Sequence, residues 1–375
     1  MKLRRAFISI LAPVSALILA LLVSSVAVLL IHKNPLTAFK TMAQFGIRTD
    51  SLIFMVNEAI PLFIAGLAVA LGFKMGLFNI GVEGQFTIAA LMAAYVGGVA
   101  PVPGPIRIIL ILIAAMVVGS VWAGIAGVLK VTRGVHEVIS TIMLNFIAFG
   151  VTSYLLANWL KQHNAPGDFL IKTKEIPKSS LIPSLNGLLR VLGGHPPAGA
   201  NLYGFLPIAL AVGVLYYVLV WRTRFGYDLR ASGANPEAAT ASGVDSKAMI
   251  LKTMLISGAV AGLVGMPDLF GLYHRYTIDF VTGLGFLGIA VALVGRNHPV
   301  GIALASLLFG FLDRSAQILD LEGIPKEITI IMRGVIILSV VIAYEVVRRL
   351  VQAQEVRTAA ARTRRSAEQP GAVVA

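Results

Sequence analysis

The sequence predicts an all-α polytopic membrane protein with about ten transmembrane helices. Hydrophobic residues make up 57% of its 375 residues and charged residues 13%, whereas a soluble domain carries roughly 25% charged residues. Long apolar runs recur along the chain, and a helix needs about 20 apolar residues to cross the hydrocarbon core of a bilayer. Lysine and arginine cluster in the breaks between these runs and near both ends of the chain, as is typical of membrane–water boundaries.

Ten apolar segments are candidate spans. In chain order they are residues 7–31, 52–72, 85–100, 108–129, 137–158, 202–221, 249–266, 278–295, 300–312 and 328–347. The first follows a basic start, but it is longer than the apolar core of about 7 to 15 residues in a signal peptide, so we expect it to be retained. The ninth is short, which makes it a candidate broken or re-entrant helix. We therefore expect one transmembrane domain over residues 1–347.

Basic residues orient the spans, because short translocated loops tend to lose lysine and arginine. Placing both termini in the cytoplasm leaves a modest majority of the basic residues inside. Residues 159–201 then form a long extracytoplasmic loop rich in Pro, Gly and Lys, and residues 222–248 a cytoplasmic segment. The basic residues 348–375 have the composition of a disordered cytoplasmic tail.

The two halves of the chain predict an inverted repeat. Residues 7–158 and 202–347 each hold five candidate spans, so the second set would start on the opposite side of the membrane. The fragments IAGLAVALGFKMGLFN and VAGLVGMPDLFGLYHR occupy matching places and share an AGL-then-GL spacing. Many transporters have such symmetry, although spans rich in Gly and Leu also resemble one another by chance.

Several classes of function are excluded by pattern. The formal charge of +13 is spread over loops and termini, so it does not indicate nucleic-acid binding. The chain has no cysteine, and an HExxH-like string at His136 has Ser140 in place of the second zinc ligand. Gly283, Gly285 and Gly288 match GxGxxG inside an apolar run, where close helix packing is the better interpretation. The chain carries no GxxxxGK[ST] phosphate loop, so we expect no ATPase site, metal or cofactor of its own.

A polar, glycine-rich break interrupts the apolar pattern in KMGLFNIGVEGQF, residues 74–86. At membrane depth such a break is tolerated where protein or a water-filled cavity surrounds it, which favours a lining of a translocation path. A cytoplasmic turn between two spans is the alternative. The polar candidates for this path, some of which lie near span ends, are Asn57, Glu58, Asn79, Glu83, Gln85 and Asn145.

The most informative segment is YDLRASGANPEAATASGVDSKA, between the sixth and seventh candidate spans. Asn235 fits a helix N-cap, Pro236 the first helical position, Glu237 the first turn and Gly243 a C-terminal stop. These signals predict a helix of about two turns, too short to be stable alone. Its small side chains would allow a groove of another protein to approach closely, although a loop helix lying on its own chain is the alternative.

At this point the residues resemble a known family. The stretch LRASGANPEAATASGV is similar to the cytoplasmic coupling segment of ABC importer permeases in the ribose, simple-sugar and branched-chain amino-acid group. GLFNIGVEGQ, HEVISTIMLNFIA and the region 277–295 resemble the nucleoside permeases of that group, and the likeness covers roughly residues 50–347. The positions that match the coupling segment, together with the neighbouring glutamate, are Gly233, Asn235, Pro236, Glu237, Ala238, Ala239 and Gly243.

The resemblance implies a membrane-spanning permease subunit of an ATP-driven importer in a prokaryotic cell membrane. It implies a pathway formed by two permease subunits, a separate ATPase subunit that binds ATP and Mg, and an extracytoplasmic binding protein that delivers the solute. A nucleoside is the expected solute, with simple sugars next and branched-chain amino acids third. An ion-coupled secondary transporter is the alternative class, although such proteins commonly need intramembrane carboxylates that are scarce here. An intramembrane hydrolase ranks last, since no nucleophile and base pair emerges from the spans.

Overall fold

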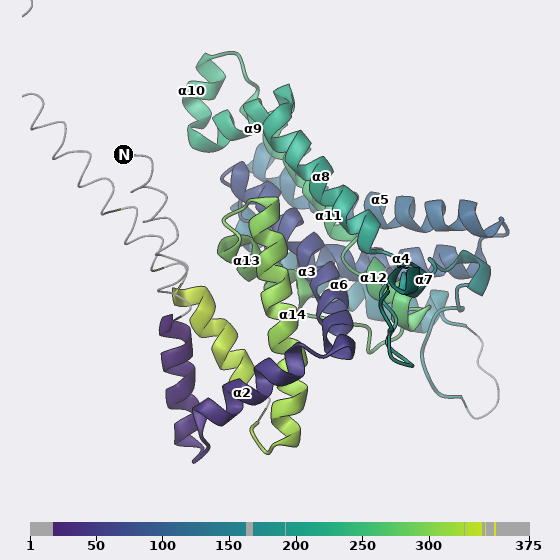
Figure 1. The fold of residues 1–375 in the computed structure, drawn as a ribbon. Coiled ribbons are helices and arrows are strands. Elements are labelled where there is room, and N and C mark those ends of the chain that lie inside the picture. Colours follow the sequence, from purple (N-terminus) through teal and green to yellow (C-terminus); the bar gives the residue numbers. More distant parts are fainter. Residues whose placement is uncertain are drawn as a thin grey trace, which may run out of the picture. The chain divides into compact units, whose positions relative to one another are not determined.

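The computed structural model describes residues 18–162, 168–191, 193–325 and 327–339, together with Ile342 and Arg349. It divides into two compact units, residues 43–315 and residues 1–42 with 316–375. The described residues are almost all helical, and the β structure among them is a single bridge between Lys172 and Thr277 (Figure 1). The all-α prediction is confirmed.

Among the described residues, six helices are long and apolar enough to cross a membrane. They are α3 (Thr49–Lys74), α4 (Val82–Val99), α5 (Gly104–Arg133), α6 with the π-helix η1 (Glu137–Leu160), α11 with α12 and η3 (Ser246–Tyr273), and α14 (Pro299–Leu321). Two bent pairs raise the number to eight if each is one span. These pairs are Ile18–Leu30 with α2 (Pro35–Gly46), bent by 115°, and α8 (Leu206–Arg222) with α9 (Arg224–Ala234), bent by 70°.

The other described helices are short. They are η2 (Lys178–Ser180), α7 (Asn186–Val191), α10 (Pro236–Ala241) and α13 (Leu284–Val294), while residues 327–339 form a further helical stretch. The polar loop predicted at 159–201 contains η2 and α7. Its backbone forms hydrogen bonds with residues 274–276. Thr173 N donates to Tyr276 O at 2.9 Å and Ile176 N donates to His274 O at 2.8 Å.

Two of the ten predicted spans, the ninth and the eighth, differ from the helices of the structure. The ninth, 300–312, is part of a 23-residue helix, so its interpretation as a short or re-entrant segment is wrong. Asp313 and Arg314 end the apolar run but not the helix, and Arg314 pairs with Asp50 at 3.1 Å. The eighth, 278–295, contains only the 11-residue helix α13. Parts of the first and last spans, and the predicted tail 348–375 apart from Arg349, lie outside the described residues.

Close packing within residues 43–315 depends on small residues. A Cβ on Gly119 of α5 would lie 2.3 Å from Gly258 O of α11, and one on Gly262 would lie 2.0 Å from Ala115 O. Such backbone contact is the usual way for helices to pack in a membrane, where lipid competes for apolar side chains.

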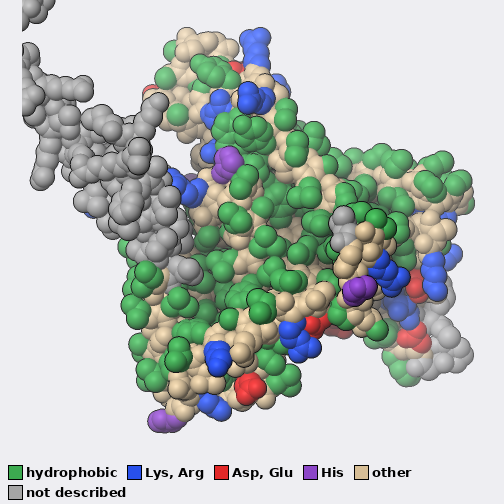
Figure 2. All heavy atoms as spheres, in the orientation of Figure 1, with side chains coloured by type: hydrophobic (Ala, Val, Ile, Leu, Met, Phe, Trp, Pro, Cys, Tyr) green, Lys and Arg blue, Asp and Glu red, His purple; other side chains and the backbone are tan. Residues whose placement is uncertain are grey.

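The face of the molecule drawn in Figure 2 is covered mostly by apolar side chains, with Lys and Arg toward its margins.

Candidate functional site

The predicted coupling segment, residues 222–248, begins where α8 breaks into α9. Thr223 Oγ1 accepts a hydrogen bond from Gly226 N at 3.1 Å and donates one to Leu219 O at 2.6 Å. The turn leaves no room for a side chain at Gly226, because a Cβ there would lie 2.2 Å from Leu219 O. The chain therefore leaves α8 at a fixed angle, and α9 and α10 project together from the end of the helices (Figure 1).

Helix α10 begins and ends at the residues that the sequence predicts. Asn235 has an extended backbone, and its Oδ1 accepts from Ala238 N at 2.9 Å. Pro236 occupies the first helical position. Gly243 has a φ of 86°, in the left-handed region where glycine is favoured, and it donates from its N–H to Thr240 O at 3.0 Å. The predicted local structure is confirmed.

Helix α10 is attached to the rest of the chain along one side. Ala239 is 5% exposed, and it is the buried residue of this helix. Ser246 donates to Pro236 O at 3.0 Å and lies 3.1 Å from Thr240 Oγ1. The opposite side is exposed and carries mostly small side chains: Pro236, Glu237, Ala238, Ala241 and Ser242. Because these side chains are mostly small, a groove of another protein can approach the exposed side closely.

Gly233 brings the coupling segment directly onto a membrane span. A Cβ on this glycine would lie 2.3 Å from Lys74 O and 2.9 Å from the carbonyl carbon of Met75, at the end of α3. Leu229, one turn earlier in α9, is fully buried in a cluster with Met75, Leu77, Ala126 and others. A displacement of α9 would therefore reach the end of α3 through backbone contact.

The polar break after α3 is the second predicted site, and its side chains bond to one another. Asn79 Nδ2 donates to Ser257 Oγ of α11 at 2.9 Å. Asn79 Oδ1 accepts from Gln85 Nε2 at 2.9 Å, and Ser257 in turn donates to Ala68 O at 2.7 Å. Asn79 and Gln85 are each 1% exposed, so this network joins α3, α4 and α11 in the interior.

Asn145 on α6 holds the same break from the other side. Its Oδ1 accepts from Gly84 N at 2.8 Å, and its Nδ2 donates to Ile80 O at 3.0 Å. A Cβ on Gly84 would lie 2.8 Å from Asn145 Cα, so glycine is needed for this approach.

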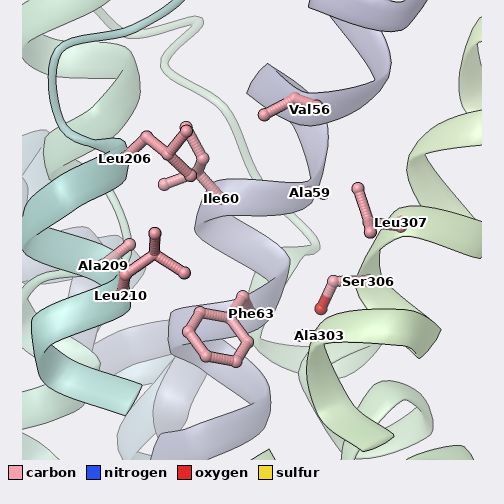
Figure 3. A pocket seen from close by; sticks show the side chains of 10 residues that line it. All are labelled: Val56, Ala59, Ile60, Phe63, Leu206, Ala209, Leu210, Ala303, Ser306 and Leu307. Atoms are coloured by element: carbon pink, nitrogen blue, oxygen red, sulfur yellow. The ribbon is translucent and has the colours of Figure 1, made fainter. Parts of the chain in front are cut away.

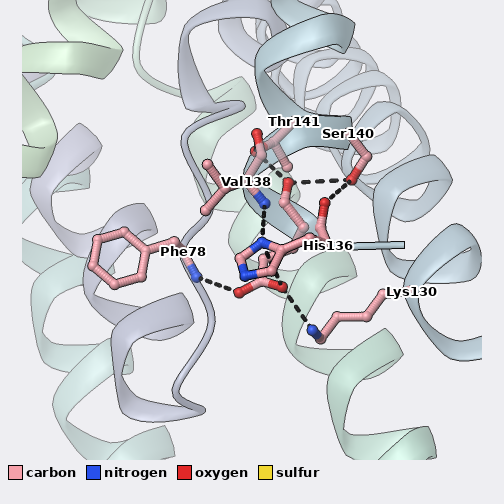
Figure 4. Close-up of polar contacts among 7 residues, drawn as sticks. Phe78, Lys130, His136, Val138, Ser140 and Thr141 are labelled. Atoms are coloured by element: carbon pink, nitrogen blue, oxygen red, sulfur yellow. Dashed lines mark hydrogen bonds and ion pairs between the residues drawn. The ribbon is translucent and has the colours of Figure 1, made fainter. Parts of the chain in front are cut away.

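Glu137, at the start of α6, anchors the break near its beginning. Figure 4 shows Phe78, Lys130 and His136, which surround it. Lys130 Nζ donates to Glu137 Oε2 at 2.6 Å, and Phe78 N donates to Oε1 at 3.4 Å. His136 acts as the N-cap, because its Nδ1 accepts from Val138 N at 3.3 Å. The HExxH-like string is therefore a helix start, and no group of metal ligands occurs among the residues that were described.

Glu83 bonds to a helix that lies far away in sequence. Its Oε1 accepts from Gly283 N at 2.5 Å and its Oε2 from Gly285 N at 2.8 Å, at the start of α13. Gly283 and Gly285 belong to the GxGxxG string, and Gly288 lies against Ala65 of α3. The packing interpretation of that string is confirmed.

Asn57 and Glu58 lie near the beginning of α3. Asn57 Nδ2 donates to Asn201 O at 2.7 Å and its Oδ1 accepts from Tyr203 N at 2.9 Å, so this side chain fastens the segment before α8. The neighbouring Glu58 is exposed.

The six predicted path residues therefore fall into two places. Asn79, Glu83, Gln85 and Asn145 surround one break, whereas Asn57 and Glu58 lie near the other end of α3. Sequence reasoning missed the partners Ser257, Gly283 and Gly285. Two signals in the sequence could have indicated these partners. One is a serine beside a glycine inside the apolar run of α11, and the other is the GxG at the start of α13.

One apolar pocket lies between α3, α8 and α14 (Figure 3). It has a volume of about 100 Å³ and is lined by Val56, Ala59, Ile60, Phe63, Leu206, Ala209, Leu210, Ala303, Ser306 and Leu307. The hydroxyl of Ser306 donates to Ile302 O at 2.8 Å. The pocket therefore offers little to a polar solute.

Comparison with known proteins gives a family and several relatives. Residues 51–341 match the family described as branched-chain amino acid transport system / permease component. A guanosine ABC transporter permease of Bacillus subtilis is 37% identical over 300 residues, 78% of this chain and 83% of the relative. A glucose ABC transporter permease of Haloferax volcanii is 34% identical over 88% of this chain and 86% of its own length. A nucleoside ABC transporter permease of Lactococcus lactis is 27% identical over 94% of this chain and 96% of its own length.

Proposed function

This chain belongs to the permease family of branched-chain amino acid transport systems, and on that premise we propose that it conducts a nucleoside in an ATP-driven importer. Membership makes it a membrane-spanning permease of an ABC transporter, whose ATPase site is in a separate subunit. ATP and Mg accordingly belong to that partner.

The nucleoside proposal depends mainly on one observation. Two relatives, the guanosine permease at 37% identity and the nucleoside permease that aligns with 94% of this chain, carry this class of solute in their names. A simple sugar is the second candidate, because the glucose permease is 34% identical over 88% of the chain. A pathway for either solute needs hydroxyl-binding groups, and the polar residues near the ends of α3 are the candidates.

The exposed side of α10 is the proposed docking site for the ATPase subunit. The proposed coupling residues are those of the segment from Gly233 to Gly243. Closure of the ATPase on nucleotide would pull α10, and the contact of Gly233 with Lys74 would pass this movement to α3. Alternating access would follow from the tilt of the attached spans.

The remaining partners follow from the same proposal. An extracytoplasmic binding protein would deliver the solute, and a second permease subunit, most simply a homologous one, would complete the pathway. Both termini would lie in the cytoplasm, which puts α10 on the side of the ATPase.

Uptake measurements test the proposal. Cells with and without this subunit are given radiolabelled guanosine, with unlabelled guanosine, glucose or leucine as competitors. We expect uptake that needs the subunit and ATP and is blocked by guanosine. Competition by glucose alone would favour the sugar alternative, whereas uptake that survives ATP depletion and collapses with an ionophore would overturn the importer class.

A further inference from the structure

The junction between α4 and α13 is built around a single buried carboxylate. Glu83 is 1% exposed, and both of its oxygens accept backbone hydrogen bonds from the start of α13. Gly283, the N-cap residue of α13, has no side chain to cap the helix. Glu83 also lies in the first turn of α4. One carboxylate thus lies at the positive N-terminal ends of both α4 and α13, and its charge stabilises both helix dipoles. The contacting residues, Glu83 and Gly283, are 200 positions apart in the sequence.

The backbones at this junction touch. A Cβ on Gly285 would lie 2.3 Å from Glu83 N and 2.6 Å from Glu83 Cα. One turn later, a Cβ on Gly288 would lie 2.7 Å from the Cβ of Ala65 in α3. Helix α13 is only about 17 Å long at 1.5 Å per residue, so this junction holds a large part of it.

Separation of α13 from α4 would be costly. It would leave a carboxylate and two N–H groups without partners in a region closed to water. By contrast, α10 is held through the hydroxyls of Thr240 and Ser246 and is largely exposed. A movement driven from α10 is therefore expected to leave the α4–α13 junction intact.

We propose that Glu83 is a positioning residue that joins α4 to α13, and that α3, α4 and α13 move as one body during transport. This inference rests on the proposed function for its assay, but it does not depend on which solute is carried. It assigns Glu83 to the mechanics of the pathway and away from direct contact with the solute.

A disulfide tests whether α3 and α13 move together, and the chain has no cysteine of its own that would compete. A Cβ on Gly66 of α3 would lie 3.6 Å from Val291 Cβ of α13, within the disulfide range of about 3.5–4.5 Å. The Gly66→Cys, Val291→Cys variant is assembled with its partner subunits in proteoliposomes, oxidised, and checked by mass spectrometry. We expect unchanged uptake and ATPase activity after oxidation. Loss of both on oxidation, with recovery on reduction, would overturn the proposal, and Gly66→Cys alone controls for the substitution.

A second variant separates positioning from solute binding. Glu83→Gln keeps the side-chain size but directs an NH₂ group at a backbone N–H. We expect the ratio of folded to unfolded protein to fall about tenfold, as the loss of a buried hydrogen bond predicts. This appears as a lower thermal midpoint and a lower maximal uptake rate from fewer active transporters, with an unchanged KM for solute. Glu175→Gln, at an exposed carboxylate in the outer loop, is the matched control. A KM that rises while the maximal rate stays constant would show solute contact and overturn the proposal.

In both tests we also measure the ATPase activity of the whole transporter, stimulated by its binding protein. If guanosine is not the solute, wild-type uptake fails while this ATPase comparison still distinguishes the variants. An error in the proposed function is thereby distinguished from an error in the role of Glu83.

Discussion

The coupling segment and the α4–α13 junction differ in how far their contacts reach along the chain. In the coupling segment the cap of α10 joins Asn235 to Ala238, three residues away. At the junction Glu83 bonds to Gly283 and Gly285, about 200 residues away. Within the first region α10 is exposed and held mostly by neighbours in sequence, whereas the junction is buried and depends on the complete fold. We therefore expect substitutions at the junction to affect folding, and substitutions in the coupling segment to affect partner binding and energy transfer.

The largest effect is expected at Gly285. The Gly285→Ala substitution introduces a Cβ against the backbone of Glu83. Such overpacking typically lowers the free energy of unfolding by about 1–3 kcal/mol, and occasionally by more. We expect a large drop in the yield and thermal midpoint of the purified transporter. Gly150→Ala is the matched control, because a Cβ at Gly150 in α6 meets nothing within 4 Å. Equal stability of the two variants would contradict the backbone contact.

A smaller effect, of a different kind, is expected at Gly233. A Cβ there would lie 2.3 Å from Lys74 O, so Gly233→Ala should push α9 away from the end of α3 at a cost of about 1–3 kcal/mol. We expect the protein to fold and bind its ATPase subunit, but with less solute transported per ATP hydrolysed. Measurement of uptake and ATPase activity on the same proteoliposomes checks this ratio. An unchanged ratio in a properly assembled complex would show that this contact does not transmit movement.

The third prediction concerns the cap of α10. Asn235→Ala removes the hydrogen bond to Ala238 N, and loss of an N-cap costs about 1 kcal/mol. We expect the affinity for the ATPase subunit to fall by about fivefold, measured by titration of the detergent-solubilised permease. Asn235→Asp retains a capping oxygen and should bind nearly as well as the wild type. Equal weakening by both substitutions would indicate that Asn235 contacts the ATPase itself and does not act through the helix.

The sequence predicted these two regions unequally, for physical reasons. The ends of α10 depend on side chains within a few residues, and the pattern of Asn235, Pro236 and Gly243 was sufficient. The apolar runs likewise predicted the long spans, because membrane burial requires about 20 apolar residues whatever the neighbours are. The roles of Glu83 and Asn145 depend on which distant backbone lies beside them. Neither periodicity nor composition carries that information. The length of α14 was underestimated for the same reason, because the helix continues past Asp313 and Arg314, and Arg314 pairs with the distant Asp50 of α3.

The smallest effect is expected in the loop at residues 159–201, where Asp168 pairs with Lys172. The hydrogen bond from Lys172 holds the pKa of Asp168 below its ordinary value of 3.8. The folded state therefore favours the ionised carboxylate. This contribution is fully present above pH 3.8 and is lost as the pH falls through the lowered pKa. Because the pair is local and partly exposed, its effect on stability should be close to the limit of measurement.

Thermal midpoints of the wild type and Asp168→Asn, measured in detergent between neutral pH and pH 3, check this prediction. We expect a difference that is very small at neutral pH and disappears at the acid end, with Lys172→Met behaving in the same way. A difference that grows as the pH falls would mean that Asp168 stabilises the loop in its protonated form. The ion pair with the neighbouring Lys172 would then not account for the contribution of Asp168, in contrast to α10, whose ends are set by neighbours in sequence.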